Sequence, residues 1–246
     1  MKAMIFAAGL GTRLKPITDN KPKALVEVNG KPLLEHVISR LQKYGYSDII
    51  INIHHFAEQI KDFLKHKNNF GIHIEISDES DELLDTGGGL KKALWFFNDG
   101  MPFLVHNVDV LSDVDLESFY QSHIQSNSIA TLAVRQRKTS RYFLFDDMLS
   151  LCGWKNTNTG EIKISKGNSD ALIPLAFSGI QVLSPEIFEL INETGKFSMI
   201  DVYLRLATYN RITGFRHDTG YWFDLGKPDN LKEAENNLHE NTRLYE

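Results

Sequence analysis

The chain has little cysteine, no long apolar run and no excess of basic charge. Its single cysteine, Cys152, excludes an intrachain disulfide and a thiolate-rich metal site. No stretch reaches the ~18 apolar residues of a membrane-spanning helix. The apolar start is too short to predict a signal peptide. With 27 basic and 32 acidic residues, the net charge is −5, which argues against a nucleic-acid-binding face. We expect a cytoplasmic protein with no membrane or nucleic-acid partner. The oligomeric state stays open, and a monomer is compatible with the sequence.

Apolar residues make up 42% of the 246-residue chain, and strand-like and helix-like stretches alternate through residues 1–135. Strands are expected at 2–6, 48–53, 72–76, 102–106 and 129–135, and helices at 33–44, 56–64, 86–97 and 116–124. Such alternation requires crossover connections, so it predicts a mostly parallel sheet with helices on both faces. Ligands of these sheets bind beyond the carboxyl ends of the strands.

Residues 136–246 have a different pattern. We expect an antiparallel pair at 141–146 and 149–154 and a polar loop or flap at 156–169. Further strands are expected at 177–183, 212–217 and 221–224, and helices at 185–191, 199–209 and from 228 onward. No repeat or linker separates the two halves. The sequence therefore predicts one domain, residues 1–246, divided near residue 135.

The most informative stretch follows the first strand and runs from Ala7 to Arg13, with Lys23 shortly after it. Glycines let the backbone turn tightly and leave N–H groups accessible. Backbone donors together with two cations suit a polyphosphate. A dinucleotide-binding fingerprint would need a third glycine where Leu14 stands, and no Gly-Lys-Ser/Thr of a Walker A loop follows.

Two carboxylates are candidates for holding a magnesium ion. Asp109 follows a strand that ends at Asn107-Val108, and Asp224 lies in the otherwise apolar stretch 222–226. A buried acid needs a partner, and magnesium is held by one or two carboxylates together with phosphate oxygens and water. The alternative for each is a helix cap or a turn residue.

Three glycines, Gly87 to Gly89, open a predicted helix although glycine disfavours helices. Close approach of a base or ribose to the backbone would explain them, and a flexible turn is the alternative. His54 and His55 are adjacent at a strand end, so their side chains diverge and a metal pair is not expected.

These motifs resemble those of sugar-1-phosphate nucleotidyltransferases. The resemblance spans nearly the whole chain and rests on residues 9–14, 22–25, 30–34, 109, 177–180 and 222–226. Residues 84–89 and the short C-terminal part are most similar to N-acetylmuramate-1-phosphate uridylyltransferases, and mannose- and heptose-1-phosphate guanylyltransferases are close relatives. The resemblance implies an α/β fold of three layers, Rossmann-like and GT-A-like, with a mixed, mainly parallel central sheet.

The resemblance also implies a reaction in which a sugar-1-phosphate oxygen attacks the α-phosphorus of a nucleoside triphosphate and pyrophosphate leaves. Residues 1–135 would bind the nucleotide. Residues 136–246 would bind the sugar phosphate and include the closing C-terminal helix. The favoured substrates are UTP and N-acetylmuramate 1-phosphate. Arg13, Lys23 and Asp109 are the implied catalytic residues, and Mg²⁺ would lie on Asp109 and Asp224. The implied nucleotide-binding residues are Ala7, Ala8, Gly9, Gly11, Thr12, Arg13, Lys23, Gly87, Gly88 and Asn107, and the sugar-phosphate-binding residues are Arg141, Lys155, Ser178 and Gly179.

The chain departs from the family pattern in two places. Val108 stands where the family has glycine, and valine resists positive φ, so the loop before Asp109 is expected to differ. The family's Glu-Lys-Pro stretch is not evident, and Arg141 and Lys155 are candidates to replace its lysine.

Other functions stay open at this point. One is transfer from GTP to mannose or heptose 1-phosphate. A second uses CTP and phosphocholine, with the amine held by Trp154 and Trp222. A third is a nucleotide-binding regulator without catalysis.

Overall fold

The structure is a computed structural model that describes residues 1–168 and 171–240, and the chain divides into two compact units. Unit 1 combines Met1–Leu83, His106–Asp113 and the chain from Tyr221 onward, and unit 2 combines Leu84–Val105 and Val114–Gly220. Each unit is assembled from segments that are distant in sequence. The units do not coincide with halves divided at residue 135, and folding as one domain stays a prediction.

Unit 1 is built on parallel strands. Strand β1 (Lys2–Phe6) pairs with β4 (Asp48–Ile53), and β4 pairs with β5 (His73–Asp78). The centre of β4 is completely buried, as its continuous β-branched sequence predicts. Helices α1 (Leu33–Lys43) and α2 (Ala57–His66) bury one apolar stripe each, at the spacing that the sequence predicts. The unit also contains η1 (Thr12–Leu14), η2 (Lys23–Leu25), β2 (Glu27–Val28), β3 (Lys31–Pro32), η3 (Asn68–Gly71) and α7 (Pro228–Glu240).

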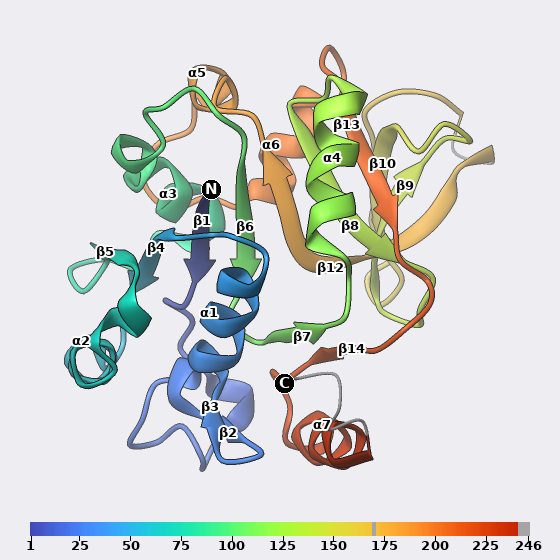
Figure 1. Ribbon diagram of the computed structural model, residues 1–246. Coiled ribbons are helices and arrows are strands. Elements are labelled where there is room, and N and C mark those ends of the chain that lie inside the picture. The colour runs from blue at the N-terminus through green and yellow to red at the C-terminus, as the bar shows by residue number, and fades with distance from the viewer. Residues whose placement is uncertain (169–170, 241–246) are drawn as a thin grey trace. The chain divides into compact units, whose positions relative to one another are not determined.

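A two-stranded antiparallel sheet in unit 1 joins distant parts of the chain. Strand β7 (Val110–Ser112) pairs with β14 (Trp222–Asp224), and the two run side by side in Figure 1. The strand expected at 221–224 is confirmed. Three residues are too few to give β7 a periodic signal, so the sequence did not predict it.

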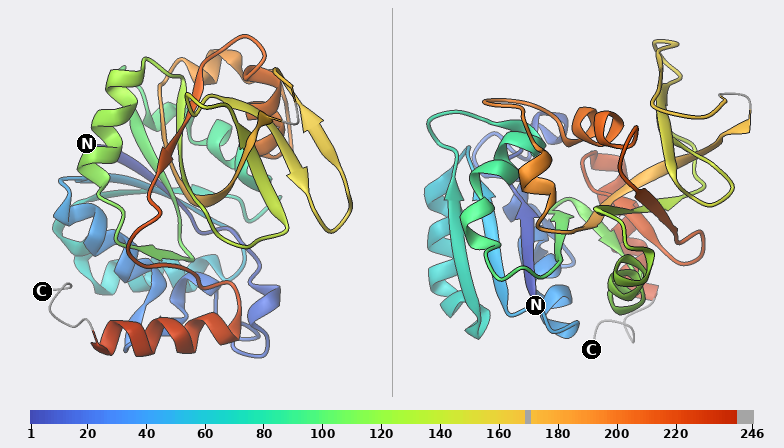
Figure 2. Two further views of the ribbon diagram at one scale, coloured as in Figure 1. Left: turned by 90° about the vertical axis from the view of Figure 1, so that its right-hand side faces the viewer. Right: turned by 90° about the horizontal axis from the view of Figure 1, so that it is seen from above.

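Unit 2 has a mixed sheet. Strand β8 (Ala130–Arg135) pairs antiparallel with β12 (Ile173–Leu183) and parallel with β13 (Ile212–Arg216). Strands β9 (Arg141–Phe145), β10 (Leu151–Asn156) and β11 (Ile162–Ile164) continue from β12 in antiparallel pairs, and Figure 2 shows β10 beside β11. Strand β6 (Phe103–Asn107) begins in unit 2 and ends in unit 1. The helices of unit 2 are α3 (Asp85–Lys92), η4 (Leu94–Phe96), α4 (Leu116–Ser126), α5 (Ile187–Leu190) and α6 (Met199–Leu206).

Most predicted elements are confirmed, and the errors have physical causes. The stretch 156–169 was expected to be a loop, but residues 162–164 form β11. All three are exposed, so no alternation of buried and solvated side chains marks the strand in the sequence. Residue 169 lies outside the described part. The helix expected at 86–97 breaks after Lys92 into η4. Among the residues that the structure describes, no helix has the length and apolarity to cross a membrane.

A buried polar network ties α4 to the sheet of unit 2. His123 lies 2.9 Å from Thr131 Oγ1 through Nδ1 and 3.0 Å from Ser184 Oγ through Nε2. Thr131 in turn contacts the hydroxyl of Thr213 on β13 at 3.2 Å. Burial lowers the pKa of His123 to about 4. The histidine is therefore neutral in the folded protein at neutral pH.

This network predicts a pH-dependent stability. Because the folded-state pKa lies below the ~6.5 of an unfolded chain, the unfolded state binds the proton first as the pH falls. Between pH 7 and pH 5, His123 alone should lower the free energy of unfolding by about 2 kcal/mol. Urea titrations followed by circular dichroism at both pH values measure this change.

The matched pair for that measurement is His123→Gln and His66→Gln, since His66 is exposed on α2. In His123→Gln, the change in the free energy of unfolding between pH 7 and pH 5 should be smaller by about 2 kcal/mol. In His66→Gln, the whole change should remain. An unchanged pH dependence in His123→Gln would contradict the assignment.

Candidate active site

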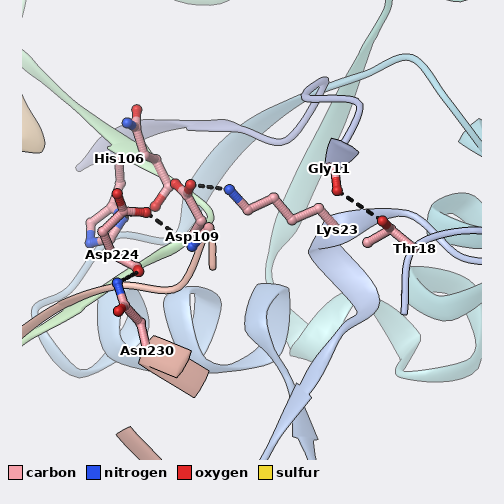
Figure 3. A network of polar contacts seen from close by, with 9 residues as sticks. Gly11, Thr18, Lys23, His106, Asp109, Asp224 and Asn230 are labelled. Atoms are coloured by element: carbon pink, nitrogen blue, oxygen red, sulfur yellow. Dashed lines mark hydrogen bonds and ion pairs between the residues drawn. The ribbon is translucent and has the colours of Figure 1, made fainter. Parts of the chain in front are cut away.

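The loop after β1 has its turn fixed at Gly11. The Gly11 carbonyl accepts hydrogen bonds from the Thr18 hydroxyl at 2.8 Å and from the Leu14 N–H at 2.9 Å. Gly11 has a φ of 66°, and a Cβ placed on it would lie 3.0 Å from Thr18 Cγ2 and 3.2 Å from Lys23 Cβ. Both the positive φ and the close contacts require glycine. Figure 3 shows the Thr18 contact and the extended Lys23 side chain.

The backbone N–H groups of this loop fall into two sets. The Ala7 N–H donates to Asn52 Oδ1 at 2.8 Å, and the Asn52 amide donates to Glu79 Oε1 at 2.7 Å. Within the described part of the chain, the N–H groups of residues 9–13 have no acceptor. Residues 9, 10, 12 and 13 are exposed, whereas Ala7 and Ala8 are buried. The exposed donors of the loop therefore begin at Gly9, and the N–H of Ala7, a predicted nucleotide-binding residue, is already bonded to Asn52.

Lys23 and Asp109 form an ion pair at the end of β6. The Lys23 ammonium contacts Asp109 Oδ2, and both side chains are largely buried. The preceding Val108 donates its N–H to the Phe6 carbonyl at 3.1 Å. Among the described residues, the non-glycine residues with positive φ lie elsewhere, so Val108 has an ordinary backbone. This agrees with the resistance of valine to positive φ, and the expected difference from the family's loop stays a prediction.

Asp224 lies next to Asp109 because of the β7–β14 pairing. Asp224 is opposite Val110, and the Leu225 N–H donates to the Asp109 carbonyl at 2.7 Å. The Gly226 N–H donates to Asp224 Oδ1 at 2.9 Å, and the Asn230 amide of α7 donates to the Asp224 carbonyl at 2.6 Å. Figure 3 shows the two aspartates on the same side of the Lys23 ammonium. The structure thus brings together two predicted site residues from distant parts of the chain.

Arg13 reaches the same place from the first loop. A Cβ on Gly226 would lie 2.5 Å from Arg13 Nη2 and 2.8 Å from Asp224 Oδ1. The guanidinium therefore packs on the Gly226 backbone beside the Asp224 carboxylate, and only glycine leaves room for it. Two cations and two carboxylates meet here and balance each other in charge.

His106 lies beneath these carboxylates and adds no charge. Its Nδ1 is 2.8 Å from the Asn107 carbonyl, and burial lowers its pKa to about 4. The ring is neutral at physiological pH. Asn107, which follows it at the end of β6, is half-buried.

The two aspartates suit magnesium only if a substrate completes the coordination. Among the described residues, no group of three or more His, Cys, Asp or Glu side chains is placed to hold a metal ion. Magnesium commonly takes one or two carboxylates and fills its other positions with phosphate oxygens and water. The donor set fits that mode of binding.

The glycines of α3 have a packing role inside unit 2. A Cβ on Gly87 would lie 2.3 Å from the Phe197 ring, and a Cβ on Gly88 would lie 2.3 Å from the Gly195 carbonyl. The Gly87 N–H also donates to the Phe197 carbonyl at 2.9 Å. Close packing against residues 195–197 is sufficient to require these glycines, and contact of a nucleotide with this backbone stays a prediction.

Arg141 and Lys155 lie on opposite faces of the β9–β10 ribbon. Lys155 is opposite Tyr142, with its ammonium 5.6 Å from the ring centroid, and Arg141 is opposite Asn156. Neighbouring residues of a strand point to opposite faces, so one ligand on one face of the ribbon meets only one of the two cations.

Ser178 and Gly179 lie at an irregularity of β12. The Ser178 hydroxyl is completely buried and 2.7 Å from His217 Nε2, and Gly179 has a φ of 76°. The register with β8 shifts between Phe177 and Gln181, which accounts for the glycine. Their predicted contact with a sugar phosphate stays a prediction.

Trp154 is a poor element for a choline cage. The residue is 9% exposed, and the Lys163 ammonium lies 5.7 Å from the centroid of its ring. A cation already occupies one face of the ring, and little surface is left for a second.

Sequence reasoning did not find four residues that shape the site. They are Thr18, Asn52, Gly226 and Asn230, which contact Gly11, Ala7, Arg13 and Asp224 respectively. For Gly226, the one signal in the sequence was its place at the end of the stretch 222–226, two residues after Asp224.

The family model for nucleotidyl transferases matches residues 2–241. The chain is 35% identical over 242 residues to the N-acetylmuramate alpha-1-phosphate uridylyltransferase of Neisseria meningitidis serogroup B, covering 96% of this chain and 97% of that one. It is 33% identical over 248 residues to the protein of that name from Caulobacter vibrioides, covering 97% of each chain.

A more distant relative also matches most of the chain, and a solved structure shows the same fold. A mannose-1-phosphate guanyltransferase of Yarrowia lipolytica is 30% identical over 241 residues, covering 93% of this chain and 61% of the relative. A UDP-glucose pyrophosphorylase from Acinetobacter baumanii has the same fold, with a TM-score of 0.80 at 20% identity, covering 99% of this chain and 95% of that one. This confirms the predicted three-layer α/β fold with a mixed central sheet. The chain belongs to the nucleotidyl transferase family, as the residues of its first loop and its two aspartate segments predicted.

Proposed function

We propose that the protein transfers a nucleoside monophosphate from a nucleoside triphosphate to a sugar 1-phosphate in a magnesium-dependent reaction. The favoured substrates are UTP and N-acetylmuramate 1-phosphate. The two relatives named for that reaction are 35% and 33% identical and align over nearly the whole chain, which supports this pair.

The observation that carries the proposal is the meeting of Lys23, Asp109 and Asp224. Strand pairing and the Leu225–Asp109 hydrogen bond hold both carboxylates beside the Lys23 ammonium. Arg13 packs against Gly226 beside Asp224. A nucleotide cradle alone needs no second carboxylate, whereas phosphoryl transfer between two anions needs concentrated positive charge.

In the proposed reaction, the free N–H groups of residues 9–13 bind the outer phosphates of the triphosphate, and Lys23 neutralises charge on the α-phosphate. When bound at Asp109 and Asp224, magnesium supplies further positive charge for phosphate oxygens of both substrates.

An oxygen of the sugar phosphate forms a bond to the α-phosphorus while the bond from that phosphorus to the bridging oxygen of the β-phosphate breaks. The attacking oxygen is already anionic, so no base has to remove a proton. Arg13 stabilises the charge that accumulates on the departing pyrophosphate. Catalysis then consists of positioning and charge neutralisation.

A panel assay tests this function. The protein is incubated with Mg²⁺, each of UTP, GTP, CTP and dTTP, and each of N-acetylmuramate, mannose, glucose and heptose 1-phosphate, and released pyrophosphate is measured. UTP with N-acetylmuramate 1-phosphate should be fastest, and EDTA should abolish release. If no pair releases pyrophosphate, the proposed function is wrong.

GTP with mannose 1-phosphate is the second candidate. The relative named mannose-1-phosphate guanyltransferase, 30% identical over 93% of this chain, favours it. Faster pyrophosphate release from GTP and mannose 1-phosphate than from any UTP pair would decide for this candidate.

The two aspartates should be individually indispensable. Replacing either Asp109 or Asp224 with Asn removes one charged metal ligand and should lower kcat at least ~10²-fold while the melting temperature changes little. Asp19→Asn is the control, because Asp19 is exposed and forms a surface ion pair with Lys15. Wild-type turnover in Asp109→Asn or Asp224→Asn would refute the metal assignment.

Gly226→Ala tests the position of Arg13. The new methyl would displace the flexible end of Arg13 and should lower kcat/KM roughly tenfold, about the loss of one charge-assisted hydrogen bond. Steady-state kinetics of Gly226→Ala, Arg13→Ala and the double variant measure the coupling between the two positions. In an Arg13→Ala background, Gly226→Ala should cause little further loss, and a full tenfold loss there would contradict the role assigned to Gly226.

A further inference from the structure

The orientation of the Gly11–Thr12 peptide is held by one buried side chain. Thr18 is 2% exposed, and its hydroxyl donates to the Gly11 carbonyl at 2.8 Å. The Thr18 Cγ2 packs against Gly11 as well, because a Cβ added to Gly11 would lie only 3.0 Å from it. Backbone hydrogen bonds from the Ile17 and Asp19 N–H groups, at 2.9 and 3.1 Å, fold the segment around Thr18.

Because the direction of the Gly11 carbonyl is fixed, the direction of the Thr12 N–H is fixed too. A trans peptide is planar, so its C=O and N–H point in opposite directions. With the Gly11 carbonyl turned toward Thr18, the Thr12 N–H points away from Thr18. This N–H has no acceptor within the described residues, and Thr12 is exposed.

The alternative orientation of this peptide would be harmful to an anion site. Glycine permits many backbone conformations, so the peptide on its carboxyl side rotates easily unless something holds it. A rotated peptide would present a carbonyl oxygen, with its partial negative charge, where the phosphate should bind. The Leu14 N–H is the other donor to the Gly11 carbonyl, at 2.9 Å, and it belongs to the single turn of η1.

We propose that Thr18 is a positioning residue, which holds the Gly11–Thr12 peptide with its N–H directed outward as a donor to a polyphosphate. Thr18 itself does not touch the ligand. The inference rests on the proposed function, because it names how the first loop prepares to bind the triphosphate.

The test uses inorganic tripolyphosphate as the probe, measured by isothermal titration calorimetry on the full-length protein. Thr18→Val keeps the shape of the side chain and removes the hydroxyl. It should weaken tripolyphosphate binding about tenfold, the magnitude of one lost hydrogen bond to a charged group. In steady-state assays it should raise the KM for the nucleotide and leave the KM for the sugar phosphate unchanged.

A second pair of variants separates the hydroxyl from packing. Thr18→Ser and Thr18→Ala both lose Cγ2, and they differ only in the hydroxyl oxygen. Thr18→Ser should bind tripolyphosphate with nearly wild-type affinity, and Thr18→Ala should bind it about tenfold more weakly than Thr18→Ser, even if both have lowered melting temperatures.

Equal affinities of Thr18→Ser and Thr18→Ala, or wild-type affinity of Thr18→Val, would overturn the proposal. Failure of the proposed function looks different. In that case the wild-type protein releases no pyrophosphate in the panel assay, while the difference between the serine and alanine variants persists.

Discussion

The site depends on the short antiparallel pairing of β7 with β14. That pairing sets Asp224 opposite Val110, and the Leu225 N–H then reaches the Asp109 carbonyl at 2.7 Å. The side-chain amide of Asn230 on α7 donates a hydrogen bond to the Asp224 carbonyl and holds it in place. Without this pairing, the Asp109 segment would keep Lys23 as its ionic partner, but the second carboxylate and the glycine that accommodates Arg13 would be elsewhere.

Charge balance explains why such a cluster is stable without a ligand and receptive to one. Lys23 and Arg13 offset Asp109 and Asp224, and His106 beneath them is held neutral by burial. A group with no net charge has a small cost of desolvation compared with a lone buried charge. The free N–H groups of residues 9–13 add dipoles that favour an anion without adding a charge. In the proposed reaction, Asp109 and Asp224 would hold magnesium, which would supply positive charge to offset the two anionic substrates.

Sequence patterns predicted the parts of this account that are local. The strands β1 and β4 and the helices α1 and α2 follow from apolar periodicity. Two glycines and two cations of the first loop are the basis for the proposal that it binds phosphate. Long-range contacts were not predictable in the same way. The glycines of α3 pack on residues 195–197, and Arg141 and Lys155 occupy opposite faces of one ribbon. The Val108 N–H donates to the Phe6 carbonyl at the end of β1, a contact that no local pattern marks. Each of these outcomes is decided by a neighbour that is remote in sequence.

The central claim is that Asp109 and Asp224 hold one metal ion together with the triphosphate. Electron paramagnetic resonance of Mn²⁺ titrated into the protein with UTP tests this claim most directly, because it reports binding independently of turnover. The wild-type protein should bind Mn²⁺ in the presence of UTP. Asp109→Asn and Asp224→Asn should each lose nearly as much affinity as the double variant, since both carboxylates serve one ion. Wild-type Mn²⁺ affinity in either single variant, or losses that simply add in the double variant, would contradict the account.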